Sequence, residues 1–274
     1  MQAVNPIAFS FSNFEVRWYG ILIAIALILG ILISYFMAKY RGQKPDEAIN
    51  FAPFAVIFGV IGARLLHVAV NWSYYSANLS YIYQLRRGGL AIQGVMIGGI
   101  IALFVFCKVR KLNFWIWADI MAPALIFGQA VGRWGNFFNQ EAFGLPTSLP
   151  WGIYIDPINR PTVYSNADYF HPTFFYEFVA NLVLFGLLLL LHRMYKKRPD
   201  KFPEGLILCA YLGIYAIYRS IIEAYRVDSS FFLGIKVVHI IDGITIIAVL
   251  IMINYLVKKF RIKKMQEEME KREE

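Results

Sequence analysis

The chain has 274 residues, of which 58% are hydrophobic and only 16% are charged, and its mean hydropathy is +0.52. These values lie far outside the range of an ordinary soluble domain and indicate a membrane protein. The formal net charge of +9 is explained by basic loops between membrane spans, so it requires no nucleic-acid partner.

Apolar runs long enough to cross a bilayer, about 20 residues at helical rise, recur along the chain. The first run is too long for a signal peptide and lacks a basic leader and a cleavage site, so we expect a retained span. The sequence predicts an all-α integral membrane protein with seven transmembrane helices. The runs cover roughly Trp18 to Ala38, Ile49 to Val70, Leu90 to Cys107, Phe114 to Val131, Thr173 to Leu191, Gly205 to Tyr225 and Val238 to Val257.

The loop charges predict the orientation, because Lys and Arg gather in cytoplasmic loops. Basic residues are concentrated in alternate loops, and the opposite loops carry far fewer of them. We therefore expect an outward amino terminus and a cytoplasmic carboxyl terminus. The basic loops contain Lys39, Arg41 and Lys44, then Lys108, Arg110 and Lys111, then Arg193, Lys196, Lys197, Arg198 and Lys201, and finally the tail from Lys258 to Arg272.

One connection is unusually long, and it runs for roughly forty residues between the fourth and fifth spans, from Gly132 to His171. Its prolines, aromatic residues and β-branched residues predict a small ordered extracytoplasmic cap. The expected organisation is transmembrane helices 1–4 over 1–131, the external segment and cap over 132–172, helices 5–7 over 173–257, and a charged, helical cytoplasmic tail over 258–274.

Ionisable residues inside spans are costly, about 2.5 to 3.5 kcal/mol each, and are functional candidates by default. In "YAIYRSIIEAYR", the residues Tyr215, Arg219, Glu223 and Arg226 share a helical arc of roughly 80°. Arg219 and Glu223 could simply neutralise each other within the helix. Against that reading, the second span has its own polar stripe of Arg64, His67 and Asn71, and the fourth ends in Arg133.

Several inward arginines with few acids to balance them predict an anion pocket, because arginine binds phosphate oxygens in a bidentate way. We expect the anion to be a phospholipid head group. The stretch "GRWGNFFNQEAFG" supplies polar partners in Asn136, Asn139 and Glu141. Its glycines at 132, 135 and 144 are expected to permit tight backbone turns.

This stretch resembles the signature of the bacterial prolipoprotein diacylglyceryl transferases, Gly-Arg-x-Gly-Asn-Phe-x-Asn-x-Glu-x-x-Gly, at all eight defined positions. The resemblance covers nearly the whole chain, in the family order. Its other segments are "RWYG" at Arg17, "GARLLHVAVN" at Gly62, "GGLAIQG" at Gly88, "HPTFFYE" at His171 and "YAIYRSIIEAYR" at Tyr215.

The resemblance implies an enzyme of the bacterial cytoplasmic membrane whose site faces the outer leaflet. It would transfer the diacylglyceryl group of phosphatidylglycerol to a cysteine thiol in the signal peptide of a lipoprotein precursor, releasing glycerol phosphate. The implied catalytic residues are Arg133, Arg219, Tyr19 and Glu141. The implied substrate-binding residues are Arg133, Asn136, Asn139, Gly144, Tyr215, Glu223, Arg226, Gln93, Arg64 and His171.

Gln93 departs from the family pattern, since many members carry a histidine at the corresponding position. That histidine is a candidate for the base that takes the thiol proton, and glutamine cannot act as one. One possibility is that the family histidine is structural and that the positive field of the arginines is enough to favour the thiolate. The other is that this chain is a divergent copy with weak or altered activity. His171 could substitute, while His67 and His239 are weaker candidates.

Two other functions fit a chain with this composition. A carrier for anions or lipids would need a polar path to the cytoplasm, but "GLILCAYLGI" in the sixth span is apolar apart from Tyr211. A metal-dependent phosphatidyl transferase would need clustered aspartates, whereas Asp119 and Asp242 are isolated in the sequence. We expect neither a metal nor another cofactor.

Overall fold

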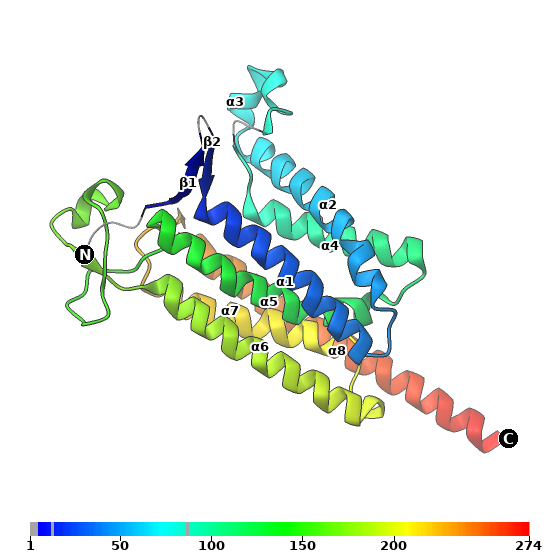
Figure 1. Ribbon diagram of the computed structural model, residues 1–274. Coiled ribbons are helices and arrows are strands. Elements are labelled where there is room, and N and C mark those ends of the chain that lie inside the picture. The colour runs from blue at the N-terminus through cyan, green and yellow to red at the C-terminus, as the bar shows by residue number, and fades with distance from the viewer. Residues whose placement is uncertain (1–4, 12–13, 86–87, 274) are drawn as a thin grey trace. The chain divides into compact units, whose positions relative to one another are not determined.

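The computed structural model describes residues 5–11, 14–85 and 88–273 (Figure 1). Within this part of the chain, seven helices are long and apolar enough to cross a membrane. The prediction of seven transmembrane helices is confirmed, and the chain is a multi-pass membrane protein. These helices are α1 (Trp18–Tyr40), α2 (Asp46–Val70), α4 (Ile92–Arg110), α5 (Phe114–Asn139), α6 (Thr173–Lys197), α7 (Leu206–Ala224) and α8 (Val237–Glu273).

The remaining elements are short. A five-residue helix, α3 (Trp72–Ser76), follows α2. Three antiparallel two-stranded hairpins accompany the helices, so the all-α description holds for the membrane part. They pair β1 (Ile7–Phe11) with β2 (Phe14–Arg17), β3 (Ile153–Tyr154) with β4 (Tyr169–Phe170), and β5 (Phe231–Phe232) with β6 (Ile235–Lys236).

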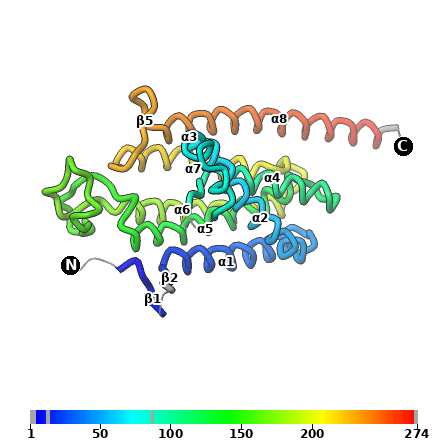
Figure 2. The backbone as a smooth tube through the Cα atoms, turned by 90° about the horizontal axis from the view of Figure 1, so that it is seen from above, coloured from blue at the N-terminus to red at the C-terminus, as the bar shows by residue number. Residues whose placement is uncertain are grey.

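Two helices continue well past the apolar runs that predict them. Helix α8 includes the charged tail, as expected for a helical extension, and Figure 2 shows it without a break. Helix α5 continues past Val131 to Asn139, so Gly132 and Gly135 are helical and the expected tight turns at these residues were wrong. Gly135 instead allows a close approach, because a Cβ there would lie 2.5 Å from Cδ2 of Tyr19.

The chain divides into two compact units, residues 34–120 and residues 1–33 with 121–274, and each is described by itself. In the first unit, α2 packs directly against α4 through small residues, as in many membrane helix pairs. A Cβ added to Gly94 would lie 2.2 Å from the carbonyl oxygen of Gly62. One added to Gly98 would lie 2.1 Å from that of Phe58.

In the second unit, α7 packs against both α6 and α8. Buried apolar side chains from α5, α6 and α7 form a common core. Because this core fixes the three helices against one another, it determines where the polar side chains nearer their other ends meet. Its members are Ala122, Ile126, Leu184, Leu188, Ile207 and Tyr211.

The segment between α5 and α6 is ordered and has its own small core of Phe143, Ile155 and Phe170. Strands β3 and β4 pair within it, and two 3-10 turns, Pro157–Asn159 and Thr162–Tyr164, connect them. These features agree with an ordered segment. Its placement as an external cap stays a prediction.

Candidate functional site

Arginines from two helices meet at one buried carboxylate. Nε of Arg133, on α5, lies 2.8 Å from Oε2 of Glu177, on α6. Nε of Arg219, on α7, lies 3.0 Å from the other oxygen, Oε1. The Glu177 side chain is only 1% exposed, so its charge is compensated by these two guanidinium groups.

The cluster continues along α7 toward its carboxyl end. Arg219 Nη1 donates a hydrogen bond to Oε2 of Glu223, one helical turn later. Arg226 Nε lies 3.7 Å from the same oxygen. The Ser229 hydroxyl donates to Oε1 of Glu223 at 2.7 Å, so both oxygens of this buried carboxylate have partners.

Arg226 forms a second ion pair just beyond α7. Its Nε and Nη2 donate to the two carboxylate oxygens of Asp228 at 2.9 and 2.8 Å. Burial opposes ionisation of Asp228, but the hydrogen bonds and charge of Arg226 outweigh it and hold the Asp228 pKa below its ordinary value. Asp228 is therefore a firmly ionised partner for Arg226.

The end of α5 connects Arg133 to the residues that follow it. Arg133 Nη1 donates to Oδ1 of Asn136 at 3.3 Å, and Asn136 Nδ2 donates to Oε1 of Glu141 at 2.9 Å. Asn139 Nδ2 also donates to that oxygen, at 3.3 Å. Gln140 and Ala142 adopt left-handed backbone conformations, with φ of 51° and 57°, and so turn Glu141 back toward α5.

Gly144 lies where three segments approach closely. Its backbone N–H donates to the carbonyl oxygen of His171 at 2.8 Å. A Cβ at Gly144 would lie 2.8 Å from the His171 Cβ and 3.1 Å from the Tyr225 carbonyl oxygen. The position therefore needs glycine for packing. Nδ1 of His171 lies 3.0 Å from the hydroxyl oxygen of Tyr176.

The two tyrosines of the predicted site both lie in the same unit as the cluster. Tyr19 covers Gly135, two residues after Arg133 on α5. Tyr215 is one turn before Arg219 on α7, and its hydroxyl interacts with Arg133, Glu177 and Arg219. Tyr215 is thus placed among the charged groups, while Tyr19 contacts their supporting helix.

Arg64 and Gln93 belong to the unit formed by residues 34–120. Arg64 is buried and its guanidinium donates to backbone carbonyls between α3 and α4, including Tyr81 at 2.5 Å, Ile82 at 2.7 Å and Gly88 at 2.6 Å. These bonds give Arg64 a role in holding that segment. Gln93 is exposed in the first turn of α4. A role for either residue in substrate binding stays a prediction.

The acids around the arginines change the expected charge balance. The sequence suggested few acids, but Glu177, Glu223 and Asp228 each pair with an arginine. That expectation was wrong because Glu177 lies on α6, far from Arg133 and Arg219 in the sequence but paired with both in the folded chain. Its signal in the sequence is an acid and an amide, Glu177 and Asn181, spaced one turn apart in an otherwise apolar span.

Below the cluster, polar contacts give way to apolar packing. Gln129, one turn before Arg133, donates from Nε2 to the Tyr211 hydroxyl at 2.8 Å. Tyr211 is also part of the buried apolar core of α5, α6 and α7. The polar cluster is therefore closed at this end by packed side chains.

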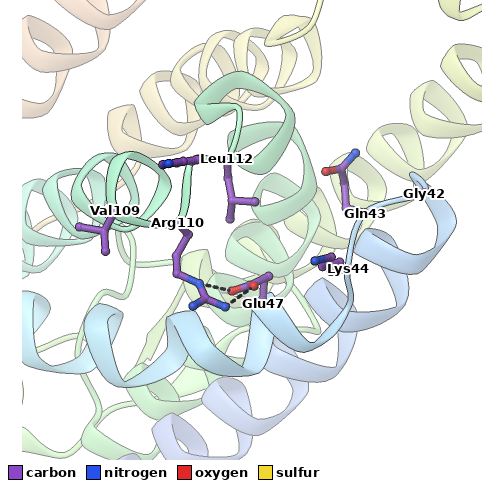
Figure 3. A pocket seen from close by; sticks show the side chains of 8 residues that line it. Gly42, Gln43, Lys44, Glu47, Val109, Arg110 and Leu112 are labelled. Atoms are coloured by element: carbon purple, nitrogen blue, oxygen red, sulfur yellow. Dashed lines mark hydrogen bonds and ion pairs between the residues drawn. The ribbon is translucent and has the colours of Figure 1, made fainter.

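A separate groove of about 560 Å³ lies in the unit formed by residues 34–120 (Figure 3). Arg110 and Glu47 are paired within it, with 3.0 Å from Nε to Oε2, and Lys44 and Lys111 also line it. None of the predicted site residues lines this groove. Among the described residues, no three His, Cys, Asp or Glu side chains are grouped so as to hold a metal ion.

Comparison with known proteins decides the family. The family model described as prolipoprotein diacylglyceryl transferase matches residues 6–255. The chain belongs to the prolipoprotein diacylglyceryl transferase family. It is therefore a membrane-embedded transferase, and the resemblance of its signature to this family is confirmed.

Relatives in this family match over most of their length. A phosphatidylglycerol–prolipoprotein diacylglyceryl transferase of Acaryochloris marina is 43% identical over 242 residues, covering 88% of this chain and 87% of the relative. The protein of that name from Synechococcus sp. (strain CC9902) is 44% identical and covers 82% and 80%. That of Synechocystis sp. is 41% identical and covers 88% and 85%.

Proposed function

We propose that this chain transfers the diacylglyceryl group of phosphatidylglycerol to the thiol of a lipoprotein-precursor cysteine. The products are a thioether and glycerol phosphate. The observation that carries the proposal is the shared buried carboxylate of Glu177, which gathers Arg133 and Arg219 from two helices. The names of the relatives, which state the lipid and the precursor, support the same reaction.

The arginines suit the part of the reaction in which charge develops. The thiolate attacks a glycerol carbon, and the bond from that carbon to the phosphate oxygen breaks. Negative charge then grows on the departing phosphate. A guanidinium group has five N–H donors, so Arg133 and Arg219 can donate to phosphate oxygens and also remain near Glu177. Such prearranged donors are usually the largest single contribution to catalysis.

The acids in the cluster hold the arginines before the lipid binds. Removing one arginine would leave the buried Glu177 carboxylate with a single compensating guanidinium group, so both ion pairs stabilise the cluster in the absence of lipid. The lipid phosphate competes with Glu177 and Glu223 for the guanidinium groups. Arg133 is oriented by Asn136, Asn139 and Glu141. The bound phosphate is bordered by Tyr215 and Arg226. The adjoining backbone is fixed by Gly144 and His171.

We place this site at the outer leaflet of the bacterial cytoplasmic membrane, with the segment between α5 and α6 as an external cap. The alternating basic loops support this orientation. The lipid reaches the cluster sideways between helices. The signal peptide of the precursor docks alongside and presents its cysteine near the membrane interface.

The same polar cluster could in principle serve a carrier for anions or lipids. The packing beneath it favours the transferase, because Ile126, Leu184, Leu188 and Tyr211 fill the space where a carrier needs a polar path. A divergent copy with weak or altered activity is the alternative raised by Gln93.

Complementation tests the proposal. The wild-type chain and its Arg133→Ala variant are produced in bacterial cells depleted of their own enzyme, and thioether-linked diacylglyceryl on a model precursor is measured by mass spectrometry. We expect modification with the wild-type chain and none with Arg133→Ala at equal membrane abundance. Unmodified precursor in both strains would contradict the transferase, and a slow but measurable rate would identify the divergent copy.

A further inference from the structure

Asp242, on α8, is a buried carboxylate that the mechanism above does not use. Its residue is only 6% exposed, and its Oδ2 has no hydrogen-bond partner within the described part of the chain. Its charge interacts with those of Arg219, Glu223 and Glu177, so it belongs to the same electrostatic environment as the arginine cluster. An acid that appears isolated in the sequence therefore lies on the helix that packs against α7, which carries Arg219 and Glu223.

The register between α7 and α8 fixes where Asp242 lies. Near the start of α8, Lys236 Nζ donates to the Glu223 carbonyl oxygen at 2.6 Å. One turn further, His239 Nδ1 lies 2.6 Å from the Ser220 hydroxyl oxygen. The helices run in opposite directions, so Asp242, one more turn along α8, lies opposite the turn of α7 just before Arg219.

The residues near this carboxylate leave it free to take a proton. The acids Glu177 and Glu223 form ion pairs with arginines, and Glu223 also accepts from Ser229. Asp242 forms no ion pair with another described residue, and its Oδ2 has no donor there. Protonation of a buried carboxylate removes the cost of an unpaired charge in a poorly solvated place. His239 is the nearest alternative base, but its Nδ1 is engaged with Ser220.

We propose that Asp242 accepts the proton of the substrate thiol, a role that Gln93 cannot perform because a glutamine amide is not a base at ordinary pH. This inference rests on the proposed function. The S–H bond breaks and the proton passes to Oδ2 of Asp242, while the sulfur electron pair forms the bond to the glycerol carbon. The bond between that carbon and the phosphate oxygen breaks with its electrons on the oxygen. Asp242 then returns the proton to the released glycerol phosphate.

The test compares wild-type, Asp242→Asn, Asp242→Glu and His239→Gln proteins, purified and assayed with phosphatidylglycerol vesicles and a precursor peptide containing one cysteine. A general base contributes roughly 100-fold or more. We therefore expect Asp242→Asn to lose at least about 100-fold in kcat near pH 7, with an unchanged KM for phosphatidylglycerol. Asp242→Glu should recover part of the rate.

The pH profile separates a proton acceptor from a merely structural residue. A free thiol ionises by itself near pH 8.5, so the rate of Asp242→Asn should rise about tenfold per pH unit up to that point. The wild-type rate should rise much less. Three results would each overturn the inference. The first is a near wild-type rate for Asp242→Asn at pH 7, and the second is an equal loss of rate in this variant at every pH. The third is that His239→Gln, and not Asp242→Asn, shows the loss that is recovered at higher pH. An inactive wild-type protein would contradict the proposed function itself.

Discussion

The guanidinium of Arg133 and the carboxylate of Glu177 form a buried ion pair between α5 and α6, with 2.8 Å between Nε and Oε2. The pair is part of a bridge, because Arg219 lies 3.0 Å from the other oxygen of Glu177. Oε1 nevertheless accepts no hydrogen bond among the described residues. The contact with Arg219 is thus the looser half of the bridge.

Replacing Glu177 by Gln should destabilise the protein strongly. The change leaves two partly buried arginines without their shared counter-charge, and breaking a buried pair costs about 3–5 kcal/mol. We expect a clear fall in the melting temperature in detergent, together with loss of transfer. Glu267→Gln is the matched control, because its partner Lys263 is 3.6 Å away and Glu267 is 55% exposed. Equal melting temperatures for the two variants would show that the Glu177 carboxylate does not stabilise the protein in this way.

Lys236 should matter for the position of the residues that follow α7. Its Nζ donates to the carbonyl oxygens of Glu223 at 2.6 Å and Arg226 at 3.0 Å. Lys236→Met removes both charge-assisted hydrogen bonds, at about 1.5–3 kcal/mol each, although the Glu223 carbonyl still accepts from the Arg226 N–H at 3.1 Å. We expect a lower melting temperature and a higher KM for phosphatidylglycerol, with partial recovery in Lys236→Arg. A wild-type KM in Lys236→Met would argue against this positioning role.

The pair of Arg226 and Asp228 should make stability depend on acid pH. Asp228 has a folded-state pKa below its ordinary value of 3.8, because Arg226 outweighs the effect of burial. Its stabilisation is complete above the ordinary pKa and is lost as the pH falls through the lowered one. The measurement is the difference in melting temperature between wild type and Asp228→Asn. We expect that difference to shrink below about pH 4; a constant difference would contradict the assignment.

The close contact of α2 with α4 gives a matched pair of glycine substitutions. A Cβ at Gly98 would lie 2.1 Å from the Phe58 carbonyl oxygen, whereas a Cβ at Gly99 would meet nothing within 4 Å. Both glycines are inside α4, so helix propensity favours alanine equally at each. We expect Gly98→Ala to lower the melting temperature and Gly99→Ala to leave it unchanged or raise it. A harmless Gly98→Ala would mean that the two helices are farther apart than described.

Much of the fold follows from the sequence because long apolar runs have few alternatives in a membrane. The helix ends are less predictable, as α5 shows, since Gly132 and Gly135 are as compatible with a turn as with close helix packing. The decisive feature at Gly135 is the ring of Tyr19, which is distant in the sequence.

The site was predictable only in part. Arg133 and Arg219 stand out because arginine is costly inside a span. Glu177 was missed as a member of the cluster because a single acid in an apolar helix gives no sign of its partners on other helices. Arg64 gives the same sequence signal as Arg219, yet its donors bind backbone carbonyls. Side-chain chemistry alone does not distinguish the two.

The central claim is that Arg133 and Arg219 bind the phosphate that departs from the lipid. The most direct measurement is kcat/KM for phosphatidylglycerol in purified wild-type, Arg133→Gln and Arg219→Gln proteins, with exposed Arg193→Gln as control. The account predicts a fall of at least about 100-fold, roughly 2.7 kcal/mol, for each cluster variant and little change for the control. Values within a few-fold of wild type for both cluster variants would contradict it.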